Sequence, residues 1–392
     1  MTVHAKEYKN DFMPFEGRVW LNSASEGPLP RVSLEALQEA ARWKALPYNL
    51  TLAKFREVPA GLKKAAARLF QVSAEDMILG NSATYGIHLL AHGLPLEKGD
   101  EVLVMQNDFP VDILPWLFLE KKGVRVRQIK PEGFQLTADE LEQNITPSTR
   151  VVCLSHVHTF SGHVLDVIKV GALCKEKGII FVLNVSQSAG CLPVVLGEWP
   201  VDAMTTSGFK WLLGPYGTGL CWITPALRER MDCSQAFWAN VLTPEEIEST
   251  GELALPETAG TSTYDVFGTA NFFNFYPLTK SIEYLNGIGL YAIREHNDRL
   301  VQQIIDGIDT NRYDLISPRD KDKRSTLVYI THKDRTKNPA IHRRLAAEKI
   351  HGALWKGNIR FAPHVFNTNE DIARLLEALN RKESHGYPYS GR

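Results

Sequence analysis

Lys210 is the residue of this chain whose type and surroundings best suit covalent chemistry. It lies in Ser207-Gly208-Phe209-Lys210-Trp211, at the end of an apolar run and shortly before Gly214-Pro215-Tyr216-Gly217. A lysine amine attacks a carbonyl carbon only when it is neutral, and burial favours the neutral form because the ammonium loses its hydration. A lysine that follows Gly-Phe is more often a surface residue, so a covalent role for Lys210 depends on the motifs around it.

A second segment has the features of an anion-binding site. Gly80-Asn81-Ser82-Ala83-Thr84 follows the strand-like run 76–79 and opens an amphipathic stretch with helical periodicity. The first turn of a helix presents N–H groups that have no partner within the helix, and the helix dipole favours a negative charge there. Ser82, Ala83 and Thr84 could therefore bind a phosphate group, although an ordinary helix cap explains the same residues.

Arg360 has the chemistry of a carboxylate-binding residue. It stands in Asn358-Ile359-Arg360-Phe361-Ala362-Pro363 near the end of the chain. A guanidinium group binds a carboxylate through two parallel hydrogen bonds and keeps its charge. By itself, an arginine before an apolar pair is usually structural, so this interpretation also depends on the rest of the chain.

These segments occur in the order that is found in one enzyme family. Together with Phe181-Val182-Leu183-Asn184-Val185-Ser186-Gln187, which precedes Lys210, they make the chain resemble the class V aminotransferase group of fold type I pyridoxal 5'-phosphate (PLP) enzymes. Cysteine desulfurases, kynureninase and isopenicillin N epimerase belong to the same group. The resemblance covers roughly residues 20–380. It implies that PLP is the cofactor and that Lys210 forms a Schiff base with it.

The resemblance also implies which residues hold the cofactor phosphate. Ser82, Ala83, Thr84 and Ser207 match phosphate contacts of the family. Thr261 matches a further contact, which comes from the neighbouring subunit in relatives. A homodimer is therefore expected, with the active site completed across its interface.

The contacts to the cofactor ring follow from the same resemblance. Phe109 matches the residue that stacks on the pyridine ring, where desulfurases have a histidine, although a core aromatic residue is an equally good interpretation. A phenyl ring can stack but cannot exchange protons. Either His158 or Thr159 matches a contact to the 3-hydroxyl group, and Gln187 matches the other contact to that group.

Asn184 departs from the family pattern, which places an aspartate against the pyridine nitrogen. A carboxylate keeps that nitrogen protonated, whereas an asparagine is neutral and offers only a plain hydrogen bond. The cofactor should then withdraw electrons less strongly, which would slow transamination more than a reaction with a good leaving group. Three explanations stay open: tuning of a specialised reaction, an engineered substitution, or loss of catalysis.

The predicted function is that of a PLP-dependent, aminotransferase-like enzyme that acts on an amino acid or amino-acid adduct. Arg360 would bind the substrate carboxylate, and Ser25 is either a second substrate contact or a plain helix cap. The alternatives are a C–S lyase, an epimerase, a decarboxylating or oxidative enzyme, and a degenerate binding protein. Desulfuration through a cysteine persulfide is not expected, because no cysteine follows Cys233.

The elements that must position these residues alternate between strand and helix. Apolar runs predict strands at 101–105, 151–155, 178–183 and 219–223. Helical periodicity predicts helices at 82–93 and 166–177. This alternation predicts an α/β fold with a mainly parallel central sheet and helices on both faces.

A smaller α+β domain is expected after the central sheet. Its predicted elements are a helical region at 278–308 interrupted by Gly287 and Gly289, a strand at 325–332, and helices at 340–349 and 369–381. We expect four units: an N-terminal segment at 1–45 that packs on the small domain, a large PLP-binding domain at 46–275, a small C-terminal domain at 276–382, and a flexible tail at 383–392.

Composition narrows the classes of partner. The formal net charge of −1 provides no basic surface for nucleic acid. No apolar run reaches the roughly 18 residues of a membrane span, and the N-terminus lacks an apolar signal core. The five cysteines contain no C-x-x-C pair, which fits a reducing cytoplasm. No metal site is expected, because His158 and His163 lack carboxylate or cysteine partners at a recognised spacing.

Overall fold

The computed structural model describes residues 8–232, 237–242, 244–248, 251–252, 260–268 and 270–381. The tail expected at 383–392 lies outside these ranges, as do the first seven residues of the expected N-terminal segment and Cys233.

The larger part of the molecule is built on a seven-stranded sheet. Its strands, in spatial order, are β2 (Met77–Gly80), β8 (Gly219–Ile223), β7 (Ala203–Ser207), β6 (Ile180–Asn184), β5 (Thr149–Ser155), β3 (Glu101–Met105) and β4 (Arg125–Ile129). Strand β8 runs antiparallel to both of its neighbours, and the other pairs are parallel. The mainly parallel sheet that the sequence predicts is confirmed.

Helices cover both faces of this sheet. The helices of the larger part are α1 (Arg31–Ala45), α2 (Leu52–Phe70), α3 (Ala83–Gly93), α4 (Leu114–Leu117), α5 (Ala138–Asn144), α6 (Val167–Lys177), α7 (Pro225–Arg228), α8 (Trp238–Val241), α9 (Pro244–Glu248) and α10 (Phe272–Ile288). Successive side chains of a strand point to opposite faces. Leu103 and Leu183 accordingly pack in the core that holds α2, α6 and α10, whereas Val104 and Val182 pack in the core that holds α3 and α4.

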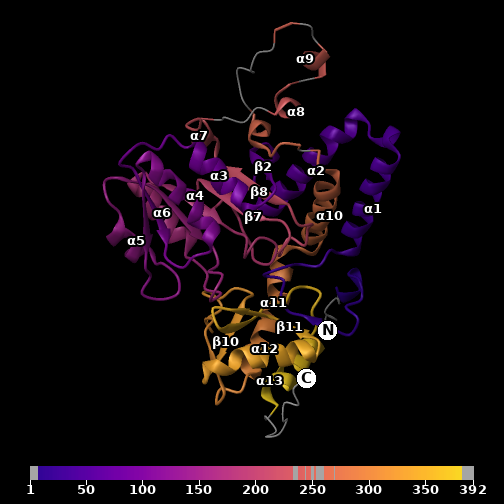
Figure 1. Ribbon diagram of the computed structural model, residues 1–392, viewed down its shortest axis with the longest axis vertical. Helices are drawn as coiled ribbons and strands as arrows, with labels where there is room; N and C mark the ends of the chain where they lie inside the picture. Colours follow the sequence, from indigo (N-terminus) through magenta and orange to yellow (C-terminus); the bar gives the residue numbers. More distant parts are fainter. Residues whose placement is uncertain are drawn as a thin grey trace, which may run out of the picture.

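The smaller part has its own antiparallel sheet of four strands. In spatial order they are β12 (Ala353–Trp355), β13 (Asn358–Phe361), β10 (Val328–His332) and β9 (Tyr313–Leu315). This sheet packs with α11 (Leu290–Gly307), α12 (Asn338–Ala347) and α13 (Asn369–Asn380) at one end of the molecule (Figure 1). Helix α13 begins at a capping box, in which the Thr368 hydroxyl accepts the Asp371 N–H and the Asp371 carboxylate accepts the Thr368 N–H.

The helical region expected at 278–308 is two helices with different bounds. Helix α10 begins at Phe272, and Pro277 lies inside it. Gly287 is also helical, so the chain is interrupted only at Gly289, whose φ of +89° lies in the region that favours glycine. The domain boundary expected between residues 275 and 276 falls inside α10, which packs against α1 and α2.

The N-terminal segment connects the two parts of the molecule. Strand β1 (Val19–Trp20) pairs in parallel with β11 (Ile350–His351) of the smaller part. The chain then crosses to the larger part, where the Gly27 N–H donates to the Phe209 carbonyl at 2.9 Å. A Cβ atom at Gly27 would collide with the Lys210 carbonyl oxygen, so only glycine permits this close approach. The segment is thereby held next to Lys210.

Among the described residues, no helix has the length and apolar character that crossing a membrane requires.

Candidate active site

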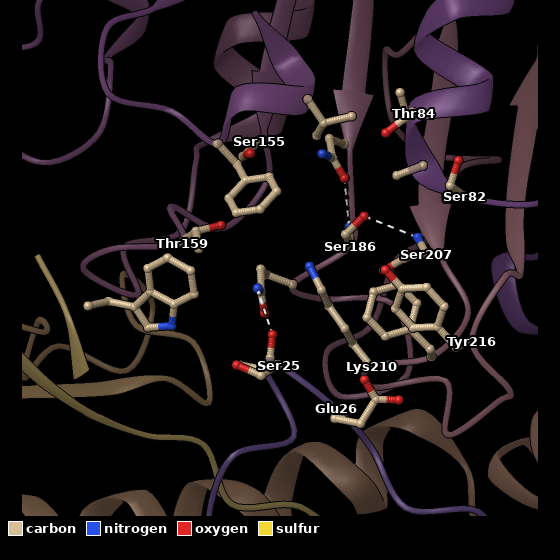
Figure 2. Close-up of a pocket in the computed structure, with 18 of the residues that line it drawn as sticks. Ser25, Glu26, Ser82, Thr84, Ser155, Thr159, Ser186, Ser207, Lys210 and Tyr216 are labelled. Carbon is tan, nitrogen blue, oxygen red and sulfur yellow. Dashed lines mark hydrogen bonds between the residues drawn. The ribbon is translucent and has the colours of Figure 1, made fainter. Parts of the chain in front are cut away.

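A pocket of about 420 Å³ lies where the carboxyl ends of β5, β6 and β7 face the smaller sheet. Ligands of open α/β sheets bind outside this edge of the sheet. The predicted site residues that line the pocket are Ser25, Ser82, Ala83, Thr84, Phe109, Thr159, Asn184, Gln187, Ser207, Lys210 and Arg360. Figure 2 shows Ser82, Thr84 and Ser207 at one end, Ser25 and Glu26 at the opposite end, and Lys210 between them.

Lys210 reaches the middle of the pocket from the loop after β7. Its Nζ lies 5.2 Å from the centre of the Phe109 ring. Burial and the nearby Arg360 charge lower the pKa of Lys210 from 10.5 to about 8, although Asp112 and Glu26 act in the opposite direction. A substantial neutral fraction is therefore present at mildly alkaline pH, which is the form that attacks a carbonyl.

One end of the pocket is suited to an anion. The first turn of α3 begins there, and the N-cap Ser82 hydroxyl accepts the Tyr85 N–H at 3.2 Å. The N–H groups of Ala83 and Thr84 stand in the same first turn, where the helix has no acceptor for them. The hydroxyl of Ser207 is buried, and no described residue forms a hydrogen bond with it. An anion would satisfy these donors together.

Asn184 and Gln187 follow β6 and line the same pocket. The Asn184 Oδ1 accepts the Ser186 N–H at 2.9 Å, and its Nδ2 donates to both oxygens of Asp112, at 2.9 and 3.1 Å. The Gln187 Nε2 donates to the Ala24 carbonyl at 3.1 Å, and its Oε1 accepts the Trp211 indole N–H at 2.8 Å. Each amide has a single orientation, because a backbone or indole N–H can only donate and must therefore face the amide oxygen. The amide nitrogen then faces the other neighbour.

The structure distinguishes the two neighbours for which the sequence left a choice. Thr159 lines the pocket, whereas His158 does not. The His158 Nδ1 shares a hydrogen bond of 2.8 Å with the Ser161 hydroxyl, and its Nε2 lies 3.3 Å from the Asn107 carbonyl oxygen. Among the described residues, Thr159 is therefore the one of the pair that a ligand in the pocket can contact.

Arg360 enters the pocket from β13 of the smaller sheet. Its Nη2 donates to the Asn22 side-chain oxygen at 2.9 Å and to the Ser25 hydroxyl at 2.6 Å. The Nε of Arg360 is buried and makes no hydrogen bond that meets the usual geometry among the described residues, although the Tyr329 hydroxyl stands near the guanidinium. A buried N–H without an acceptor is unfavourable, so the guanidinium is ready to receive an oxygen atom of a ligand.

Thr261 lies outside this pocket. It begins a short 3₁₀ turn (Thr261–Tyr264), it is buried, and its hydroxyl donates to the Glu75 carbonyl.

Several lining residues were missed by the sequence reasoning. Glu26, Ser186, Tyr216 and Trp355 line the pocket, and Asp112 lies directly behind it. Glu26 and Ser186 each adjoin a residue that was identified, so the motif context could have indicated them. Trp355 comes from β12, and nothing in its local sequence indicates that it lines this pocket.

Comparisons with known proteins agree on the family of this chain. The family model described as Aminotransferase class-V matches residues 19–375. A "Probable cysteine desulfurase" of Methanothermobacter thermautotrophicus is 26% identical and covers 96% of this chain and 98% of its own length. The "Isopenicillin N epimerase" of Streptomyces clavuligerus is 26% identical, and the aligned region covers 92% of this chain and 94% of the epimerase.

A solved structure has the same fold. The complex of the cystine C–S lyase C-DES with its product cysteine persulfide superposes with a TM-score of 0.84, at 22% identity, and covers 93% of this chain and 99% of its own.

Proposed function

This chain belongs to the aminotransferase class-V family, and from that premise we propose that Lys210 and Arg360 carry its chemistry. It is a PLP-dependent, aminotransferase-like enzyme of fold type I that acts on an amino acid or an amino-acid adduct. PLP, when bound, supplies an aldehyde that captures an amine and a ring that withdraws electrons from the adjacent carbon.

The described residues fit this cofactor. The unpartnered hydroxyl of Ser207 and the free N–H groups at the start of α3 suit the phosphate group, and Phe109 offers a flat face for the ring. Thr159 and Gln187 would contact the 3-hydroxyl group, and Asn184 the ring nitrogen. We therefore place the phosphate at the end of the pocket where α3 begins and the substrate at the opposite end (Figure 2).

The observation that carries the proposal is that Lys210, with its lowered pKa, shares a pocket with a guanidinium N–H that lacks an acceptor. Arg360 would hold the carboxylate of the substrate through Nε, and through Nη2 once the carboxylate displaces the Ser25 hydroxyl that Nη2 contacts. The Lys210 amine would hold the cofactor and then accept or return the proton at the α-carbon of the substrate.

Uptake of PLP by the cofactor-free protein tests the proposal. We expect an absorbance band near roughly 410–430 nm to appear on adding PLP. Because the pKa of Lys210 is lowered to about 8, the neutral amine becomes the major form as the pH rises through this value. The rate of uptake should therefore increase about tenfold between pH 7 and pH 9. Stopped-flow absorbance at several pH values measures this rate.

Pyridoxal without the phosphate is the matched control for this experiment. It carries the same aldehyde, so it should react with the same pH dependence but with much weaker affinity, because the donors at α3 and Ser207 stay unsatisfied. A protein that develops no band with PLP at any of these pH values would contradict the proposed function.

A C–S lyase is a second candidate, which the sequence favours through its cysteines. No cysteine follows Cys233, and the four cysteines that the structure describes are buried, so none of them is available to carry a persulfide. A β-elimination releases the sulfur group with the product and needs no such residue. Phe109, which cannot exchange protons, is also compatible with a reaction whose leaving group departs readily.

We further propose a homodimer in which Thr261 of one subunit completes the phosphate end of the other pocket. Its place outside its own pocket supports this arrangement. Lys210→Ala and Thr261→Ala each impair both pockets of their own homodimer. Mixing them should create hybrids with one intact pocket, and tight PLP attachment should return. Light scattering and the absorbance band measure this effect.

Ser262→Ala is the control for the mixing experiment, because its hydroxyl lies in the same 3₁₀ turn but donates to the Asn240 carbonyl. It should leave PLP attachment unchanged. A monomeric mass, or no recovery of attachment in the mixture, would exclude the contribution across subunits.

The proposal also covers the division into domains and the cellular compartment. The separate sheets support a division into a large and a small domain, but α10 packs against α1 and α2, so we move the boundary expected at 275/276 to the interruption at Gly289. Of residues 1–45, β1 pairs with the small domain, whereas α1 packs on the large domain. Four described cysteines, at positions 153, 174, 191 and 221, are buried and form no disulfide, which supports a location in the reducing cytoplasm.

A further inference from the structure

A buried carboxylate stands directly behind Asn184. Asp112 ends a short 3₁₀ turn after β3, and none of its surface is exposed. Its two oxygens accept hydrogen bonds from the Asn184 Nδ2, at 2.9 and 3.1 Å, and one of them also accepts the Ser155 hydroxyl at 2.7 Å. The neutral residue that replaces the family aspartate is thus in contact with an acid one layer deeper.

The orientation of the Asn184 amide is fixed by its neighbours. The Ser186 backbone N–H can only donate, so the oxygen of the amide faces Ser186 and the nitrogen faces Asp112. An amide that donates to a carboxylate becomes more polarised, and its oxygen becomes a better acceptor. The negative character of Asp112 is therefore passed through Asn184 to the wall of the pocket.

Asp112 also lacks the partner that a buried carboxylate requires. No Lys, Arg or His side chain of the described residues forms an ion pair with it or with the neighbouring Asp108. The charged and titratable groups that face this pair are Lys210 and His158, which act only at a distance, and the Cys153 thiol. Burial and the Asp108 carboxylate raise the pKa of Asp112 well above its ordinary value, and the hydrogen bonds from Ser155 and Asn184 oppose this rise. A buried negative charge of this kind is stable only when a positive charge comes near it.

We propose that Asp112 is a positioning residue that supplies, through Asn184, the negative charge that favours a protonated nitrogen in the bound cofactor ring. The inference rests on the proposed function, because it requires that the pocket binds PLP. The negative charge that the family pattern places in contact with the ring nitrogen would then be retained in this chain, one side chain further from the ring. The protonated ring in turn is the cation that Asp112 lacks.

The ring nitrogen provides a direct test. PLP is compared with its carba analogue, in which the ring nitrogen is replaced by C–H while the aldehyde, hydroxyl and phosphate are kept. Binding of both compounds to the full-length protein, Asp112→Asn and Asp112→Asn/Asn184→Asp is measured by fluorescence titration. Asparagine has the shape of aspartate: its oxygen can still accept the Asn184 N–H, and its nitrogen, which only donates, can donate to the Ser155 hydroxyl, so the first variant removes the charge and keeps a partner for both neighbours.

We expect Asp112→Asn to lower the preference for PLP over the carba analogue by about tenfold, which corresponds to about 1.4 kcal/mol. The double variant exchanges the two side chains, restores one carboxylate to the pair, and should return the preference to within about threefold of the original. An equal loss of affinity for both compounds in Asp112→Asn, or no loss for either, would overturn the inference.

Asp202→Asn is the matched control. The Asp202 carboxylate accepts the Phe181 N–H at 2.8 Å near the start of β6, away from the pocket, and burial raises its pKa too. It should leave the preference unchanged. If Asp112→Asn melts well below this control, its own preference still decides, because PLP and the carba analogue are compared on the same protein: a lowered preference supports the inference and an unchanged preference overturns it. An original protein that binds neither compound refutes the proposed function itself.

Discussion

Lys210→Ala is expected to lower kcat by at least about a thousandfold, the largest effect of any single substitution in this chain. The amine of Lys210 is the one nitrogen nucleophile with a lowered pKa among the described pocket residues, and it lies 5.2 Å from the Phe109 ring that would stack on the cofactor. Alanine can neither hold the cofactor nor move a proton. Steady-state turnover and the absorbance of the bound cofactor measure the two losses separately.

The fold should survive this substitution. Among the described residues none forms a hydrogen bond or an ion pair with the Lys210 amine, and burial disfavours its charged form, so its removal breaks no such contact. Lys280→Ala is the control, because Lys280 pairs with Glu283 on the exposed side of α10, away from the pocket. A Lys210→Ala protein that keeps more than about a tenth of the original kcat would show that another residue carries the chemistry.

Arg360→Lys should raise KM for amino-acid substrates by roughly 10- to 100-fold and change kcat less. The guanidinium has a buried Nε without a hydrogen-bond acceptor, and its Nη2 donates to Asn22 and Ser25, so a carboxylate that displaces the Ser25 hydroxyl would bind both nitrogens. A lysine keeps the charge but not the paired geometry, and a charge-assisted hydrogen bond contributes about 1.5–3 kcal/mol. Initial rates over a range of substrate concentrations separate the two parameters.

Arg324→Lys is a closely matched control, because Arg324 is equally buried and also has guanidinium atoms that make no hydrogen bond among the described residues, although its Nε lies 3.9 Å from Asp298. It does not line the pocket. Both variants should lose some stability, but only Arg360→Lys should raise KM, and neither should change the affinity for PLP. A similar KM in the two variants would remove Arg360 from the substrate-binding role.

The strands of the large sheet were predictable because short-range properties decide them. The runs at 101–105 and 219–223 are apolar and end at polar or glycine-containing turns, and β3 and β8 have these bounds in the structure. The family motifs lie at the ends of such strands. For this reason most of the candidate site could be predicted from local segments and their order along the chain.

Helix α10 shows why other bounds could not be read from local sequence. Pro277 lacks an N–H and favours a helix start, so the sequence indicates a beginning at 278. The structure begins this helix at Phe272, because burial of Phe272 and Phe275 in the large core offsets the hydrogen bond that proline cannot make.

The sequence by itself determined the family, the cofactor class, and the identity of Lys210, Asn184 and Arg360 as the residues to consider. Each motif is a short continuous segment, and the amine, amide or guanidinium group of its key residue indicates the reaction step or contact that the residue can provide. Only the tertiary structure decided that Thr159 rather than His158 lines the pocket. It also brought Arg360, in the smaller sheet, and Lys210, in the loop after a strand of the larger sheet, to one cavity. It also decided that Asp112 lies against Asn184, 72 residues away along the chain. Such contacts depend on how sheets pack and loops cross, which no local pattern records.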